Sequence, residues 1–446
     1  MARTSAKSYH LKIAMIFCSI LIKIYRDGSV SSNLKTQEGE EVLRLFNTLG
    51  KKTEAFRPVK EKMATIFTCG PSVYQRAHIG NFRTFLFEDI LVRYLEYSGY
   101  IVERGMNFTD IEDKALREAS KRNMTIQELT EENIRGFVEE MRLLRMRTPE
   151  YLPKASEHVE EATAIIEGLL DQGIAYRHGR NIYFDPLKYS DFGRLYGLDM
   201  SKWPTKRRRF HKDTYPGIQW NLGDFILWHG CKKGDLVSWD SPIGRGRPSW
   251  NIQDPSMISR HYHETLSIYC GGIDNLFRHH DYTRAILESV RPYPMAKYWL
   301  HCHHLYVNGA KMSKSIGNIR YTDTLREQGY DARDIRFFLI HSHYRRKLNY
   351  SDRKIQSTTD KLRRFRRMVG IIESSAHQAA PSHGILAQRL GETFVERMDD
   401  DLDVQGAFDG LHGLLSSMDL SDLKPGEAAG IMERLRRIDS VLKVLS

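Results

Sequence analysis

Cysteine is scarce in this chain of 446 residues, which has only five. They are odd in number and widely scattered, from Cys18 to Cys302. This pattern excludes the disulfide framework that staples small secreted domains. We therefore expect a protein of the reducing cytoplasm.

Long apolar runs are missing as well. The longest candidate, residues 11–24, is interrupted by Lys12 and Lys23 and is too short to cross a bilayer comfortably. The chain also has no internal repeat and no low-complexity tract, which argues against a solenoid or a disordered tail protein. We expect no membrane partner.

What the chain does contain is the balance of a globular protein, with 41% hydrophobic and 28% charged residues. Its length allows two or three domains. Lysine and arginine total 67 against 56 acidic residues, which gives a net charge of +11. A surplus of this size attracts polyanions such as nucleic acid, although it also suits an ordinary basic enzyme.

The hydrophobic pattern predicts the opening of a parallel α/β sheet. Residues 63–69 form an apolar run typical of a buried strand, and helical spacing of apolar residues begins at Asn81 and ends near Gly99. Strand-like residues follow at 100–102. After Tyr350 the spacing is helical throughout, which predicts a helical bundle.

Two short motifs carry the chemistry. His78-Ile-Gly-Asn81 lies where the first strand gives way to the first helix, the position at which α/β sheets bind nucleotides and helix N–H groups receive phosphate. Far downstream, Lys311-Met-Ser-Lys314-Ser combines two cations and two hydroxyls in one loop, as pyrophosphate binding requires. Each motif alone could be an ordinary turn or a solvated loop.

Together, in this order, the two motifs resemble the HIGH and KMSKS motifs of class I aminoacyl-tRNA synthetases. Further blocks resemble the cysteinyl-tRNA synthetases in particular. These blocks are residues 68–74, 106–114, 224–228, 244–250, 271–274, 277–280 and 398–401.

The resemblance implies an α/β fold: a Rossmann-like class I catalytic domain with an insertion, followed by an α-helical bundle. Residues 1–41 would be an N-terminal extension of unknown role, 42–130 the first half of the catalytic domain and 131–245 the inserted domain. Residues 246–320 would complete the catalytic domain, and 321–446 would form the helical stem and bundle. The resemblance ends with that bundle, so we expect no C-terminal extension that reads the anticodon.

The implied activity is ATP-dependent activation of an amino acid, with Mg²⁺, and its transfer to tRNA, which makes the chain a cysteine–tRNA ligase. The catalytic residues would be His78, Asn81, Lys311 and Lys314. ATP would be bound by His78, Gly80, Asn81, Gly272, Asp274 and Lys314. Asn81 departs from the commoner histidine, but its amide still donates hydrogen bonds.

The amino-acid pocket departs further from the family pattern. The resemblance implies that Cys69, Trp250, Asp254 and His279 form the pocket and that a zinc ion binds the substrate thiolate. Cys69 and His279 match two family zinc ligands, whereas Asp254 replaces a cysteine and Thr283 replaces a glutamate. Either Cys69, Asp254 and His279 hold zinc as a three-ligand site, or the metal has been lost.

The sequence leaves open which molecule accepts the activated amino acid. Residues 342–367 contain ten basic and two acidic residues, a local surplus of +8 that fits a tRNA backbone or a solvated helix face. One alternative is a ligase that, as in mycothiol synthesis, transfers cysteine or another small amino acid to a small-molecule amine. Another is a tRNA-binding module without activity, which the two intact motifs disfavour. We expect a monomer.

Overall fold

The structure is a computed structural model that describes residues 42–202, 224–232, 234–235, 237–313, 316–377, 379–382 and 384–445. The chain divides into two units, Met1–Glu41 and Val42–Ser446. Three sequence features lie outside the described residues: the extension 1–41, part of the predicted insertion, and both Lys314 and Ser315.

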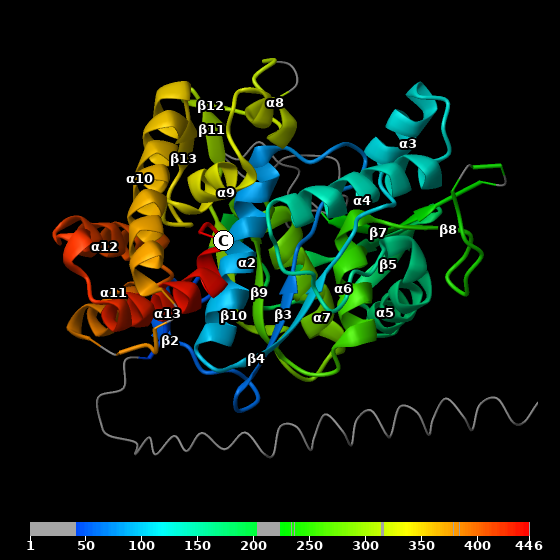
Figure 1. The fold of residues 1–446 in the computed structure, drawn as a ribbon. Helices are drawn as coiled ribbons and strands as arrows, with labels where there is room; N and C mark the ends of the chain where they lie inside the picture. Colours follow the sequence, from blue (N-terminus) through cyan, green and yellow to red (C-terminus); the bar gives the residue numbers. More distant parts are fainter. Residues whose placement is uncertain are drawn as a thin grey trace, which may run out of the picture. The chain divides into compact units, whose positions relative to one another are not determined.

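A four-stranded parallel sheet forms the centre of the second unit (Figure 1). Its strands run in the order β10 (Ala296–Cys302), β9 (Leu266–Gly272), β3 (Met63–Thr68) and β4 (Ile101–Met106). β3 is therefore an inner strand that pairs with β4 on one side and β9 on the other. The parallel sheet with its helices confirms the predicted α/β fold.

Helix α2 (Ile79–Tyr97) connects β3 to β4, as the sequence predicts. Its start is fixed by a capping box, in which the His78 side chain accepts from the Asn81 backbone N–H and the Asn81 side chain accepts from the backbone N–H of His78. Phe82 and Leu86 on this helix are fully buried. The motif residues thus define the position at which the helix begins.

Smaller sheets and further helices complete the catalytic region. The antiparallel sheet contains β5 (Ala175–His178), β6 (Asn181–Phe184), β7 (Phe225–Gly230) and β8 (Gly246–Pro248). The remaining strands are the hairpin β1 (Arg44–Asn47) and β2 (Lys52–Ala55), and the sheet of β11 (Leu305–Val307), β12 (Ala310–Lys311) and β13 (Leu348–Tyr350). The helices are α3 (Asp113–Lys121), α4 (Ile126–Leu143), α5 (Val159–Asp171), α6 (Trp250–His261), α7 (Tyr282–Val290), α8 (Thr322–Glu327) and α9 (Ala332–Ile340), with a π-helix at Leu276–Asp281.

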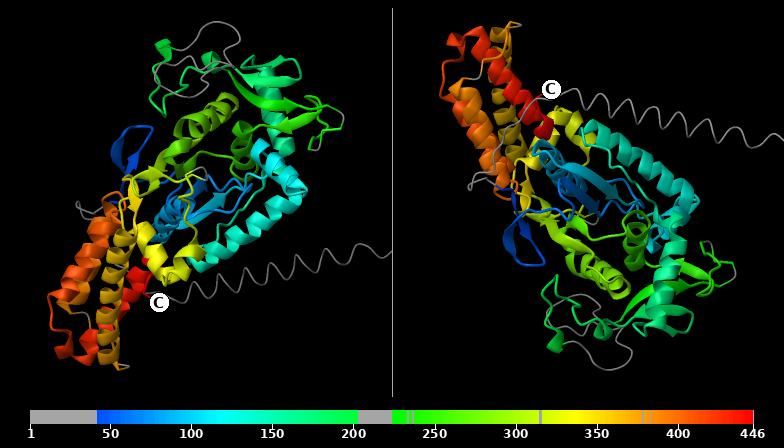
Figure 2. Two further views of the ribbon diagram at one scale, coloured as in Figure 1. Left: turned by 90° about the horizontal axis from the view of Figure 1, so that it is seen from above. Right: turned by 90° about the horizontal axis from the view of Figure 1, so that it is seen from below.

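Four helices follow β13: α10 (Asp352–Ala376), α11 (Ile385–Asp399), α12 (Val404–Ser416) and α13 (Pro425–Leu442). Among the described residues after Tyr350 no strand occurs, which agrees with the predicted bundle. Figure 2 shows these helices grouped together beside the catalytic region.

Arg336 on α9 joins this bundle to the catalytic region. Its guanidinium is fully buried and donates to the Leu442 carbonyl at 2.7 Å and the Leu144 carbonyl at 2.8 Å. It also forms an ion pair with buried Asp89 of α2 at 2.6 Å. One side chain thereby holds the ends of α4 and α13 against α2 and α9.

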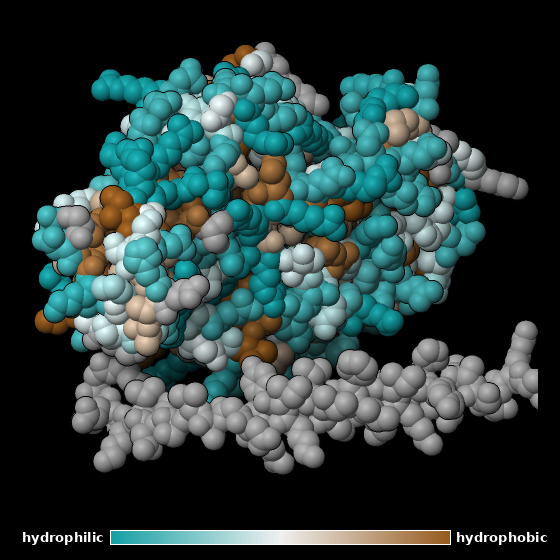
Figure 3. Space-filling model, viewed as in Figure 1, coloured by the Kyte–Doolittle hydropathy of each residue, from teal (hydrophilic) through white to brown (hydrophobic). Residues whose placement is uncertain are grey.

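The face of the molecule shown in Figure 3 is predominantly hydrophilic, with hydrophobic residues in small separate patches. Within the part of the chain that the structure describes, no helix combines the length and the apolar character needed to cross a membrane.

Candidate active site

A cavity of about 330 Å³ opens at the carboxyl edge of the parallel sheet. Parallel α/β sheets bind ligands at this edge because the strand ends and helix N-termini meet there. Eight predicted site residues line the cavity: Cys69, His78, Gly80, Asn81, Trp250, Gly272, Asp274 and Lys311. The structure thus brings together residues that are up to about 240 positions apart in the chain.

The two sequence motifs meet at Gly80. A Cβ atom at this position would lie 2.4 Å from Cε of Met312 and 3.0 Å from Cε1 of His78. Glycine therefore permits the loop after β12 to approach the start of α2. In addition, the Ile79 backbone N–H donates to the Arg320 carbonyl at 3.0 Å, which holds the loop that follows Lys311 against the same helix start.

Charged and imidazole groups line the cavity near the start of α2. Lys311 is exposed at the end of β12, and His304 Nδ1 lies 4.0 Å from Asp274 Oδ1. Burial lowers the pKa of both His78 and His304 below its usual value, although the nearby carboxylate of Asp274 acts in the opposite direction. Both imidazoles are therefore neutral hydrogen-bonding groups at pH 7.

Cys69 also lines the cavity and comes directly after β3. The preceding strand hydrogen-bonds to β9, and the Cys69 backbone N–H donates to the Cys270 carbonyl. The following residue must be glycine, because a Cβ at Gly70 would lie 1.9 Å from the Asn107 carbonyl oxygen. Burial, and next the charge of Asp254, raise the pKa of the Cys69 thiol well above its usual value.

Asp254 and His279 lie outside the cavity lining, in a buried layer beneath it. Asp254 Oδ2 accepts from the Tyr269 hydroxyl at 2.6 Å and pairs with His279 Nε2 at 3.0 Å. The Trp250 ring stacks on His279 at 4.2 Å between centroids.

The metal-ligating groups found among the described residues differ from the predicted set. Cys69, His279 and His280 offer ligand atoms that all lie within 4.8 Å of one another. Two of the predicted ligands are therefore present, while His280 is present in place of Asp254. Thr283 is buried in α7 and is not part of this group.

Comparison with known proteins assigns the family. Residues 55–360 match the family described as tRNA synthetases class I (C) catalytic domain. The cysteine–tRNA ligase of Chlamydia pneumoniae is 34% identical over 415 residues, which cover 91% of this chain and 87% of that protein. The enzyme of the same name from Koribacter versatilis is 34% identical over 412 residues, covering 91% and 82%.

The chain belongs to the cysteinyl class I tRNA synthetase family. This confirms the resemblance drawn from the motifs, and with it an ATP-dependent aminoacyl-tRNA ligase of cysteinyl type.

Solved structures confirm the class I fold. The methionyl-tRNA synthetase of Mycobacterium tuberculosis in complex with methionyl-adenylate aligns with a TM-score of 0.61 at 14% identity, over 86% of this chain and 90% of that one. A LeuRS–tRNA–LeuAMS complex from Agrobacterium radiobacter aligns with a TM-score of 0.64 at 12% identity, over 87% and 85%.

Sequence reasoning missed several cavity residues of this synthetase. His304 lies two residues after the end of β10, so the rule that ligands bind at the carboxyl ends of parallel strands could have identified it. Lys114 lies over the Tyr74 ring at 5.2 Å, and both line the cavity. Arg76 also lines it, but its partners are Glu140, at 2.6 Å, and Asp323. No local sequence pattern would have revealed the contacts of Lys114 and Arg76, because their partners lie elsewhere in the chain.

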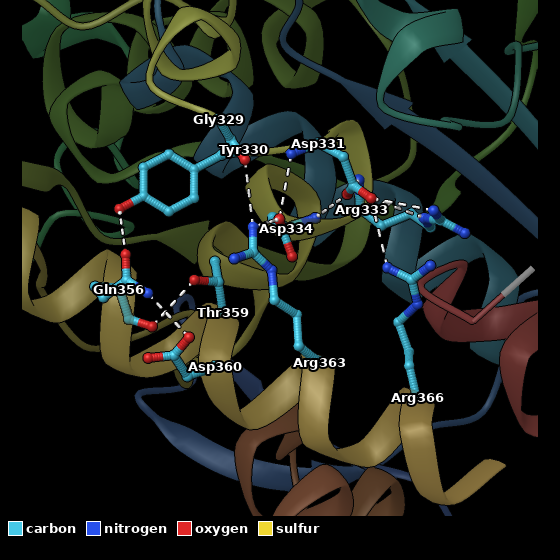
Figure 4. A network of polar contacts seen from close by, with 10 residues as sticks. All are labelled: Gly329, Tyr330, Asp331, Arg333, Asp334, Gln356, Thr359, Asp360, Arg363 and Arg366. Carbon is cyan, nitrogen blue, oxygen red and sulfur yellow. Dashed lines mark hydrogen bonds and ion pairs between the residues drawn. The ribbon is translucent and has the colours of Figure 1, made fainter. Parts of the chain in front are cut away.

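The basic segment 342–367 proves to have two kinds of cation. Four form ion pairs within the chain: Arg345 with Asp401, Lys361 with Asp409, Arg363 with Asp334 and Arg366 with Asp331. Figure 4 shows Arg363 and Arg366 extending from α10 to the capping carboxylates at the start of α9. Six others are exposed and have no recorded ion pair within the described part of the chain: Arg346, Lys347, Arg353, Lys354, Arg364 and Arg367.

Proposed function

We propose that this protein is a cysteine–tRNA ligase that uses ATP with Mg²⁺ and carries out both reaction steps with the cavity at the sheet edge. The observation that supports this most is the contact between Gly80 and Met312, which joins the two phosphate-binding motifs on one cavity.

In the first step a carboxylate oxygen of the amino acid attacks the α-phosphorus of ATP, and the bond to pyrophosphate breaks. The start of α2 presents backbone N–H groups and the neutral His78 ring to the phosphates. Lys311 and Lys314 neutralise the charge that develops on pyrophosphate, and Asp274 accepts from the ribose hydroxyls. Catalysis of this kind depends on alignment and electrostatic stabilisation rather than on a proton-transfer residue.

In the second step a terminal ribose hydroxyl of tRNA attacks the activated carbonyl, and AMP leaves. The amino acid would occupy the end of the cavity formed by Cys69 and Trp250. We propose that its side-chain thiol is selected there with the help of zinc, because a thiolate is a far better zinc ligand than a hydroxyl.

The activation step has a direct test. Purified protein is expected to catalyse ATP–pyrophosphate exchange that depends on cysteine and is much weaker with serine. Exchange should be measured with each standard amino acid separately, at enzyme concentrations high enough to detect slow turnover. Failure of every amino acid to support exchange would contradict the proposed enzyme, whereas strong exchange with another small amino acid would correct the substrate.

We further propose that tRNA contacts the exposed cations of segment 342–367. Arg353 and Arg364 lie on α10 eleven positions apart, which is about three helical turns, so they share one face with Arg367. The paired cations Arg363 and Arg366 serve another purpose, since they attach α10 to the start of α9.

This placement predicts the salt dependence of charging. Changing Arg364 and Arg367 together to alanine should raise the KM for tRNA and reduce the slope of log KM against log salt by about two units. The matched control changes Arg363 and Arg366 to alanine, which should lower stability but leave the slope intact. ATP–pyrophosphate exchange should be unchanged in the first variant.

Two other outcomes are informative. A wild-type enzyme that exchanges pyrophosphate normally but leaves total tRNA uncharged would indicate a small-molecule acceptor. If charging occurs and the Arg364 and Arg367 variant matches the wild type at every salt concentration, the activity stands and the tRNA contact lies elsewhere.

A further inference from the structure

His304 is an imidazole of the cavity whose role the two motifs do not explain. Its Nδ1 lies 4.0 Å from Oδ1 of Asp274, and both side chains line the cavity. The His304 side chain is 23% exposed, whereas that of Asp274 is 52% exposed. Among the described residues no lysine or arginine forms an ion pair with Asp274, so His304 is the basic side chain recorded beside this carboxylate.

The backbone around His304 is held on both sides by hydrogen bonds. The His303 N–H donates to the Tyr344 carbonyl at 2.7 Å, and the Leu348 N–H donates to the His304 carbonyl at 3.1 Å. Leu305, the next residue, pairs with Leu348 where β11 meets β13. The position from which the His304 side chain reaches the cavity is therefore fixed.

Asp274 lies in a much shorter element, the 3₁₀-helix Ile273–Asn275 that follows β9. Apart from the His304 ring, no hydrogen-bond or ion-pair partner of its carboxylate is recorded in the described chain. A Cβ at Gly272 would lie 2.7 Å from Asp274 Oδ1, so glycine leaves the space beside that oxygen open. A half-exposed carboxylate of this kind can rotate, yet a group that must accept from two neighbouring hydroxyls depends on its orientation.

The chemistry of the two groups is complementary. Burial lowers the pKa of His304 below its usual value, so at pH 7 the ring is neutral and donates from one nitrogen. A carboxylate beside Nδ1 favours the tautomer that carries the proton on this nitrogen. The separation of 4.0 Å is longer than a hydrogen bond, and contacts of this kind often shorten only when the ligand is bound.

We propose that His304 is a positioning residue for ATP, which donates from Nδ1 to Asp274 and directs that carboxylate towards the two ribose hydroxyls. This role rests on the proposed function, because ATP as the nucleotide and Asp274 as the ribose acceptor are both part of it. It goes further in assigning recognition of the ribose to two side chains that follow different strands, β9 and β10. Loss of His304 should therefore weaken the binding only of nucleotides that carry ribose hydroxyls.

Equilibrium binding measures this role without turnover. In isothermal titration calorimetry with ATP, His304→Leu should raise the Kd about 10-fold, the effect of losing a hydrogen bond to a charged group. With 2′,3′-dideoxy-ATP, which offers no hydroxyl to Asp274, the wild type and His304→Leu should bind equally. In ATP–pyrophosphate exchange the variant should raise the KM for ATP by a similar factor and leave kcat within about twofold of the wild type.

Two asparagine variants serve as controls. His304→Asn should restore much of the affinity, because its amide N–H can replace the Nδ1 donor. His303 does not line the cavity, and its Nδ1 accepts from the His304 N–H. His303→Asn keeps an acceptor at that place and should leave the Kd values of both nucleotides unchanged. Circular dichroism should establish that each variant is folded.

A double-mutant cycle with Asp274→Asn tests whether His304 acts through Asp274. In that background His304→Leu should have little further effect on ATP binding, because the carboxylate that it positions is gone. An undiminished effect in that background would overturn the positioning role, since His304 would then act on the nucleotide directly. Equal weakening of ATP and 2′,3′-dideoxy-ATP binding by His304→Leu would overturn it as well.

The binding and exchange results separate this role from the proposed function. A protein that binds ATP with the expected dependence on His304 but exchanges pyrophosphate with no amino acid would support the role and refute the function. Cysteine-dependent exchange with the same KM for ATP in the wild type and in His304→Leu would leave the function standing and refute the role.

Discussion

Replacing His78 by alanine is expected to slow ATP–pyrophosphate exchange by about 10²- to 10³-fold, the effect of removing one preorganised group from charged transition-state oxygens. His78 lies at the start of α2 and lines the cavity, with its ring kept neutral by burial. It can therefore donate one hydrogen bond to phosphate. Exchange should be measured at saturating amino acid, so that kcat and the KM for ATP are separated.

The same residue also caps the helix, because its Nδ1 accepts from the Asn81 N–H at 3.3 Å. Loss of the cap in His78→Ala should cost about 1 kcal/mol in the free energy of unfolding. His78→Asn is the matched control, since asparagine is among the preferred capping residues but lacks the reach of the imidazole. If His78→Asn restored exchange along with stability, the role of His78 would be that of a cap alone.

Replacing Arg336 by methionine should lower the free energy of unfolding by about 3–5 kcal/mol, because it removes one partner of a fully buried ion pair. The change leaves the carbonyls of Leu442 and Leu144 without their donor and Asp89 with Arg93 as its remaining ion-pair partner. Urea unfolding followed by circular dichroism would measure the loss. The bundle should also become more accessible to limited proteolysis.

Arg333 on the same helix provides the control for this prediction. It pairs with Asp331 near the helix start, where both side chains are partly exposed, so Arg333→Met should cost less than about 1 kcal/mol. Equal losses in the two variants would contradict the inference that Arg336 holds the bundle to the catalytic region.

Local patterns predicted the architecture well because the strands and helices are specified by neighbouring residues. The buried run at β3, the helical spacing of α2 and the absence of strands after Tyr350 in the described chain all agree with the structure. Of the cavity residues, His78, Gly80, Asn81 and Lys311 belong to the two short motifs, whereas Cys69, Trp250, Gly272 and Asp274 followed only from the family resemblance. Lys314, which belongs to the second motif, lies outside the described residues, so its role in binding ATP remains a proposal.

Long-range pairing could not be predicted in this way. The sequence shows a local surplus of +8 in segment 342–367, but it does not show that Arg363 meets Asp334 and Lys361 meets Asp409 after folding. Similarly, sequence comparison placed Asp254 where a ligand belongs, whereas its contacts with Tyr269 and His279 depend on the packing of α6 against β9 and the π-helix. In both cases the partner lies on another element, which a linear pattern does not record.

The place of β3 in the sheet has a consequence for how the protein is made. Its partner β4 follows soon after it, but β9 begins only at Leu266, about 200 residues after β3 ends. At ribosomal rates of roughly 5–20 residues per second, the open side of β3 would wait on the order of 10–40 s for its neighbour. During that interval the nascent chain exposes unpaired backbone groups along an apolar strand, which is the kind of edge that recruits other chains. Yield of this enzyme should therefore depend on chaperone supply and expression temperature more than the stability of the finished fold would suggest.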